Sequence, residues 1–211
     1  MKIYCISGLG ADYRAFQYLE LQEHEMIHIP WIEPRKGELL PAYALRLIEP
    51  FNLSQPYILM GLSLGGMMSV EISKIHKPEK LILISSIMGK HELPKRLSFA
   101  GKLGLHKVVP KAVVKTPNPL VNYLFGAQSK VKQLLAEILK DTDEVFLDWA
   151  LNAILNWQNT QTVMAHRIHG TNDHVLPVPM DRIQYPIKKG GHLMIVDHAR
   201  EVSHAIRQIL E

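Results

Sequence analysis

Short apolar runs alternate with longer helix-like patterns along most of this 211-residue chain. This alternation is typical of a parallel β-sheet whose strands are joined by crossover helices. The predicted strands cover residues 2–6, 25–29, 57–60, 81–84, 163–169 and 183–187. The predicted helices cover residues 13–19, 41–48, 64–76 and 202–210, and Asp12 and Asp197 are the expected N-caps of the first and the last. We therefore expect an α/β fold with a mostly parallel sheet of about six strands flanked by helices.

Residues 86–160 interrupt this alternation. They contain no clear strand, but they include two strong helical patterns, at 129–140 and 143–157. An all-helical excursion between two strands of one sheet is expected to cover one end of that sheet. The predicted organisation is a core of residues 1–85 and 161–211 that carries a helical cap insertion of residues 86–160.

The composition limits the class of protein. Charged residues make up 21% of the chain and apolar residues 47%, which excludes collagen-like and disordered chains. The longest weakly polar stretch, residues 57–70, is shorter than the roughly 20 residues that span a bilayer, so no integral membrane association is expected. The first residues lack the apolar run of a secretory signal, and the single cysteine cannot form an internal disulfide. We expect a cytoplasmic protein.

Residues 61–66 read Gly-Leu-Ser-Leu-Gly-Gly where a predicted strand passes into a predicted helix. In this context the pattern G-x-S-x-G indicates a nucleophilic serine. A serine on so tight a turn must adopt a strained backbone, and Gly61 and Gly65, two residues to either side, leave room for it. Ser63 is therefore the candidate nucleophile.

A serine hydroxyl is a poor nucleophile unless a base accepts its proton. His192 lies in a Gly-Gly-His-Leu loop between the last predicted strand and the last helix, and Asp173 follows the predicted strand 163–169. Both loops follow the carboxyl ends of strands, and in a parallel sheet these ends meet at one edge. The order Ser63, Asp173, His192 is the order expected of a hydrolase with this layout. These three residues are the predicted catalytic triad.

These motifs resemble the α/β-hydrolase fold serine hydrolases, and the resemblance covers almost the whole chain. It implies that Ser63 attacks an acyl carbonyl, that His192 accepts the serine proton and that Asp173 orients the imidazole. It also implies an oxyanion hole formed by the backbone N–H groups of Leu64 and of Leu9, which lies in a Gly-Leu-Gly segment similar to the family's His-Gly-x segment. No cofactor and no metal is implied, and the expected partner is a small-molecule acyl substrate.

The resemblance leaves the bond that is cleaved open. A small carboxylic ester is the favoured substrate, but thioesters, lactones, carbon–carbon bonds and acyl transfer to another acceptor remain open because one triad supports each of them. A serine at position 63 argues against relatives that use aspartate there, namely epoxide hydrolases and haloalkane dehalogenases. The alternative from another class is a catalytically silent protein that binds a ligand or a partner in the same pocket.

Basic residues are concentrated in one segment. The formal net charge is +4, and residues 86–136 hold nine lysines and arginines but only one acidic residue. Such a run is either a solvated surface or a surface that attracts an anionic substrate or a lipid surface. Because no nucleic-acid motif and no matching aromatic series accompanies it, no nucleic-acid partner is expected.

Three other patterns have simpler interpretations. Residues 24–28 read His-Glu-Met-Ile-His, but the zinc-protease motif works only on a helix and this segment alternates like a strand. A Gly-x-Gly pair at residues 8–10 lacks the third glycine of a dinucleotide-binding loop, and Cys5 is expected to be a core residue. A polar stripe on the predicted helix 143–157 either faces solvent or touches substrate, and it consists of Asp148, Asn152 and Asn156.

Overall fold

The computed structural model describes residues 1–9, 11–102, 123, 125 and 129–211. Six strands form one sheet in the order β2-β1-β3-β4-β5-β6, and all neighbouring strands are parallel. The strands are β1 (Lys2–Ile6), β2 (Glu25–His28), β3 (Tyr57–Leu62), β4 (Lys80–Ile84), β5 (His166–Gly170) and β6 (Tyr185–Ile187). The predicted parallel sheet of six strands is confirmed.

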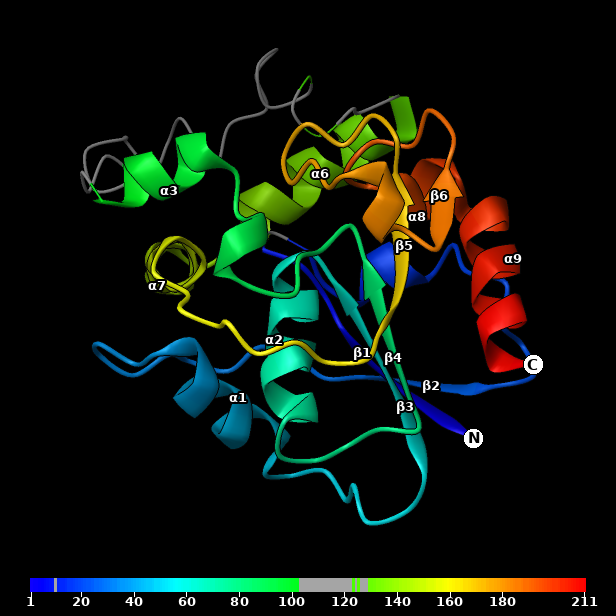
Figure 1. The fold of residues 1–211 in the computed structure, drawn as a ribbon, viewed down its shortest axis with the longest axis horizontal. Coiled ribbons are helices and arrows are strands. Elements are labelled where there is room, and N and C mark those ends of the chain that lie inside the picture. The colour runs from blue at the N-terminus through cyan, green and yellow to red at the C-terminus, as the bar shows by residue number, and fades with distance from the viewer. Residues whose placement is uncertain (10, 103–122, 124, 126–128) are drawn as a thin grey trace.

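Helices cover both faces of the sheet (Figure 1). One face packs against α1 (Leu40–Ile48) and α2 (Leu64–Ser73). The other face packs against the 3₁₀ helix η1 (Tyr13–Phe16) and the helices α8 (Met194–Asp197) and α9 (Ala199–Leu210). Burial on both faces explains why the central strands are continuously apolar: every residue of β3 is buried.

The carboxyl ends of the central strands meet at one edge of the sheet. Their register pairs Ile6 of β1 with Gly61 of β3, and Leu62 of β3 with Ile84 of β4. The loops that leave these strands, together with the loop after β5, therefore lie side by side. This edge carries the residues that were predicted from the sequence to form the site.

The described part of residues 86–160 is helical, as expected. It contains the 3₁₀ helix η2 (Lys90–Glu92) and the helices α3 (Lys95–Lys102), α6 (Ser129–Asp141) and α7 (Glu144–Leu155). Figure 1 shows α3 and α6 beyond the carboxyl ends of the strands and α7 beside α2.

Helix α7 is joined to the helical layer of the core. The indole of Trp149 stacks on Tyr43 of α1 with ring centroids 4.0 Å apart, and its Nε1–H donates to the carbonyl of Glu38 at 2.8 Å. Phe146 and Ala150 of α7 belong to the same apolar core as α1 and α2. The division of the chain into a core and a separate cap stays a prediction.

Some predicted boundaries were wrong. Strand β5 begins at His166 rather than at residue 163, and the predicted helix 13–19 is a single 3₁₀ turn that Asp12 caps by accepting from the N–H of Arg14. Asp197 does not cap the last helix but ends α8, a short helix that buries Met194, Ile195 and Val196. No helix in the described ranges combines the length and apolar character needed to cross a bilayer.

Candidate active site

Ser63 forms the turn between β3 and α2. Its backbone has φ 53° and ψ −117°, a left-handed conformation that is strained for any residue other than glycine. The turn is held by the N–H of Ser63, which donates to Ile84 O at 2.9 Å, and by its carbonyl, which accepts from Gly66 N at 2.9 Å and from Ser86 Oγ at 2.6 Å. Strain of this kind persists only where the surrounding contacts fix the backbone.

The predicted glycines surround this turn. A Cβ atom at Gly61 would lie 2.3 Å from the carbonyl oxygen of Gly65, and a Cβ atom at Gly65 would lie 2.1 Å from that of Ile6. Across the turn, a Cβ atom at Gly8 would lie 3.1 Å from Ser63 Cβ. The start of α2 therefore packs directly on the end of β1, and no side chain fits at positions 61 and 65.

The structure brings the three predicted triad residues together. His192 Nε2 lies 2.9 Å from Ser63 Oγ, and His192 Nδ1 lies 2.8 Å from Asp173 Oδ2. A carboxylate can only accept, so Nδ1 donates to Asp173 and Nε2 is left to accept the hydroxyl proton of Ser63. His192 and Asp173 are buried, whereas Ser63 is half-buried and remains accessible from solvent.

Phe125 packs on the histidine. Its carbonyl accepts from the backbone N–H of His192 at 3.0 Å, and its ring meets the imidazole edge-on with centroids 5.3 Å apart. These contacts help to fix the loop that carries His192.

The Asp173 carboxylate is held in its charged form. Oδ1 accepts from the N–H groups of Val175 at 2.9 Å and Leu176 at 3.0 Å, and Oδ2 lies within 3.0 Å of both His192 Nδ1 and His169 Nε2. Burial alone would raise the pKa of Asp173, but the two histidines outweigh it and hold the pKa well below its usual value. The carboxyl group of Asp173 is therefore ionised in the folded protein at neutral pH.

The two predicted oxyanion donors lie on either side of Ser63. Leu64 follows Ser63 as the first residue of α2, and Leu9 follows Gly8, which contacts Ser63. Within the described part of the chain, neither backbone N–H donates to a backbone carbonyl. Their role as oxyanion donors stays a prediction. Gly10, the last residue of the predicted Gly-Leu-Gly segment, lies outside the described residues.

A buried ion pair is linked to the serine turn through Ser86. The guanidinium of Arg167 on β5 makes two hydrogen bonds to the Glu92 carboxylate, at 2.8 and 2.9 Å, and it also donates to Ser86 O at 3.2 Å. The hydroxyl of Ser86 in turn donates to the carbonyl of Ser63. Burial raises the pKa of Glu92, but the hydrogen bonds from Arg167 and from Met88 N outweigh it and lower the pKa below its usual value.

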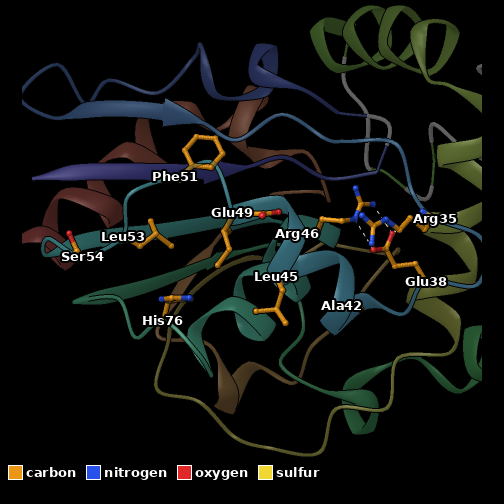
Figure 2. A pocket seen from close by; sticks show the side chains of 11 residues that line it. Arg35, Glu38, Ala42, Leu45, Arg46, Glu49, Phe51, Leu53, Ser54 and His76 are labelled. Atoms are coloured by element: carbon orange, nitrogen blue, oxygen red, sulfur yellow. Dashed lines mark hydrogen bonds and ion pairs between the residues drawn. The ribbon is translucent and has the colours of Figure 1, made fainter.

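Several hollows in the described surface lie apart from the triad. One is a groove of about 740 Å³ beside α1. Figure 2 shows side chains that line it, among them Leu45, Phe51 and the ion pair of Arg46 with Glu38. A second cavity of about 460 Å³ lies between the loops after β1 and β2 and the turn from α6 to α7. None of the predicted site residues lines either of them.

The other sequence patterns lie elsewhere. Residues 24–28 lead into and form strand β2, so its two histidines do not share a helix face. Cys5 is a buried core residue, as predicted, and burial raises the pKa of its thiol far above the usual value. Asn152 and Asn156 border a groove of about 1210 Å³ along α7.

Part of the basic segment is exposed, and part lies outside the described residues. Lys90, Lys95, Arg96 and Lys132 are exposed to solvent. The side chains of the other five basic residues of this segment lie outside the described part of the chain: Lys102, Lys107, Lys111, Lys115 and Lys130. The attraction of an anionic substrate or a lipid surface to this segment stays a prediction.

No family model and no curated protein sequence matches the chain. Solved structures do match. An esterase from Exiguobacterium antarcticum has a TM-score of 0.73 at 17% identity, covering 99% of this chain and 91% of its own. An esterase from Thermogutta terrifontis has a TM-score of 0.67 at 15% identity, covering 100% and 89%, and a bromoperoxidase from Bacillus anthracis has 0.67 at 15%, covering 99% and 91%. The chain has the α/β-hydrolase fold.

In this chain the serine turn follows β3 and precedes α2. At 15–17% identity the likeness to these structures concerns the fold, and the chemistry must come from the residues at the sheet edge.

Sequence reasoning missed two residues next to the triad. His169 was read only as the end of a strand, yet its ring reaches the Asp173 carboxylate four residues later. Ser86 was read only as the start of the insertion, yet it binds the carbonyl of Ser63. A signal for His169 was available, because a polar residue inside a strand that is buried on both faces requires a hydrogen-bond partner.

Proposed function

We propose that this protein is a serine hydrolase that cleaves a small carboxylic ester through an acyl-enzyme on Ser63. The observation that carries the proposal is the unbroken chain of hydrogen-bond contacts from Ser63 Oγ through His192 to Asp173, at 2.9 and 2.8 Å. A strained serine, a histidine and an ionised carboxylate seldom form such a chain of contacts where the three residues have only a structural role.

The first half of the reaction forms the acyl-enzyme. Ser63 Oγ attacks the ester carbonyl carbon while His192 Nε2 takes the hydroxyl proton. The negative charge that develops on the carbonyl oxygen is stabilised by the N–H groups of Leu64 and Leu9. The imidazolium then gives its proton to the alcohol oxygen, the carbon–oxygen bond breaks, and the alcohol leaves.

The second half releases the acid. Water loses a proton to His192 Nε2 and attacks the acyl carbon, and the proton returns to Ser63 Oγ as the acyl bond breaks. Throughout, Asp173 keeps the proton of the neutral imidazole on Nδ1 and stabilises the imidazolium when it forms. The ionised state of Asp173 in the folded protein supports this role.

Hydrolysis of short p-nitrophenyl esters tests this proposal. Wild-type protein is expected to turn over p-nitrophenyl acetate or butyrate, and Ser63→Ala is expected to lose up to about 10⁶-fold in kcat where chemistry limits the rate. Ser73→Ala is the matched control, because Ser73 lies on the same helix and its hydroxyl bonds only the carbonyl of Val70. A folded wild-type protein that hydrolyses no acyl ester would favour the catalytically silent alternative.

A further inference from the structure

The carboxylate of Asp173 has two imidazole neighbours rather than one. Both approach the same oxygen, Oδ2: His192 Nδ1 at 2.8 Å and His169 Nε2 at 3.0 Å. The other oxygen, Oδ1, is occupied by the two backbone N–H groups of Val175 and Leu176. All accepting directions of this carboxylate are thus filled by the protein.

The position of His169 fixes its protonation pattern. The ring lies within β5 and is only 1% exposed. Its Nε2 faces two acceptors, Asp173 Oδ2 at 3.0 Å and the carbonyl oxygen of Leu176 at 2.9 Å. Neither acceptor can donate, so Nε2 must carry a hydrogen. His169 shares this hydrogen between the carbonyl of Leu176, its nearer acceptor, and Asp173 Oδ2, while His192 donates to the acid from the loop before α8.

We propose that His169 is a positioning residue for the Asp173–His192 pair, an inference that rests on the proposed function. Its Nε2–H pins Oδ2 so that the carboxylate cannot rotate away from His192. This positioning sets how strongly Asp173 stabilises the imidazolium that forms during catalysis.

The surroundings of the pair leave few other groups that could exert this influence. Among the described residues, the titratable groups that act on the Asp173 carboxylate are His169 from β5 and His192 from the loop before α8. His192 is bordered further by Ser63 and by the uncharged ring of Phe125. His174, the next residue after Asp173, stacks on Tyr123 instead of facing the carboxylate.

Two substitutions at position 169 separate positioning from packing. His169→Met fills the buried space but removes the donor, and His169→Gln keeps an N–H donor at a similar reach. For His169→Met we expect kcat/KM to fall about ten-fold with KM little changed, because the acid is free to rotate away from the base. The acid limb of the pH–rate profile should move to lower pH by about half a unit, because a carboxylate that rotates away stabilises the imidazolium of His192 less. His169→Gln should restore most of both properties, and His204→Leu, at an exposed position on α9, is the control.

A spectroscopic readout makes the test independent of turnover. The Nδ1–H proton of His192, in its hydrogen bond to Asp173, is expected to give a low-field proton NMR resonance that shifts in His169→Met and stays near its wild-type position in His169→Gln. If the resonance behaves in this way in the two variants but the wild-type protein hydrolyses no ester, the proposed function is contradicted and the positioning role is supported.

A folded His169→Met protein with unchanged kcat/KM, acid limb and low-field resonance would overturn the inference. If His169→Met does not fold, His169→Gln decides. A folded Gln variant with the wild-type resonance supports a donor role. A folded Gln variant with a displaced or missing resonance refutes it.

Discussion

Breaking the buried ion pair of Glu92 and Arg167 should strongly destabilise the fold. The two side chains are 1% and 2% exposed, and their atoms meet in two parallel hydrogen bonds of 2.8 and 2.9 Å. Glu92→Gln leaves the shape nearly unchanged but leaves the guanidinium buried without a counter-charge. Removing one partner of such a pair costs about 3–5 kcal/mol in the free energy of unfolding. We expect a loss in this range at pH 7.

Urea denaturation followed by circular dichroism measures this loss. Glu20→Gln is the matched control, because Glu20 faces Arg200 at 3.9 Å with side chains 53% and 89% exposed. An exposed pair contributes less than about 1 kcal/mol, so the control should remain close to wild type. Replacing both partners with apolar residues, Glu92→Leu with Arg167→Met, should cost less than Glu92→Gln alone because no buried charge remains unpaired. Arg182, the other cation near Glu92 at 3.5 Å, is 47% exposed and stays solvated.

The pH dependence has a definite sign. The folded-state pKa of Glu92 is lowered, so its charged form stabilises the fold fully above the pKa of glutamate in the unfolded chain, about 4.3. The advantage of wild type over Glu92→Gln should therefore be constant near neutral pH and shrink as the pH falls below about 4. A Glu92→Gln variant as stable as Glu20→Gln at pH 7 would refute this account of the ion pair.

Three further outcomes follow from the site. His192→Ala should reduce ester hydrolysis about as much as Ser63→Ala, whereas Asp173→Asn should reduce it less, by about 10⁴-fold. If steady-state kinetics show that Asp173→Asn is harmless, another residue is the acid. Gly65→Ala should lower the free energy of unfolding by about 1–3 kcal/mol or more and abolish turnover, since its Cβ would lie 2.1 Å from Ile6 O. Gly37→Ala is the control for turnover: its φ of 71° makes a side chain there strained, but the Cβ would meet no atom within 4 Å, so stability should fall and turnover should stay unchanged. The kcat/KM values of neutral and acidic esters should respond alike to salt if the exposed lysines only keep the surface solvated, and a steeper fall for acidic esters would show that these lysines attract the substrate.

The fold was predictable from the sequence because local pattern and tertiary burial agree along the sheet. The run Tyr57–Leu62 is apolar because both of its sides are buried. The Gly-x-Ser-x-Gly spacing is required because a Cβ atom at Gly61 or Gly65 would lie 2.3 or 2.1 Å from a backbone oxygen. Strand β2 was predictable despite its His-Glu-Met-Ile-His segment, because alternation and the proline after it favour an extended chain.

The supporting residues could not be predicted, because their contacts join positions far apart in the chain. Arg167 and Glu92 lie 75 residues apart, and the bond from Ser86 to Ser63 spans 23. The short helix α8 was missed because its four residues are too few to show a helical period. His169 was close in sequence to Asp173, but a strand-end histidine gives no sign of which group its ring faces.

Labelling with a fluorophosphonate tests the central claim, that Ser63 is an activated nucleophile, most directly. Mass spectrometry of the labelled wild-type protein should show one adduct per chain, and fragmentation should place it on Ser63 rather than on Ser69 or Ser73 of the same helix. The adduct should be absent in Ser63→Ala and His192→Ala and present in Ser73→Ala. A folded wild-type protein that stays unlabelled, or an adduct on any other residue, would contradict the assignment of Ser63 as the nucleophile.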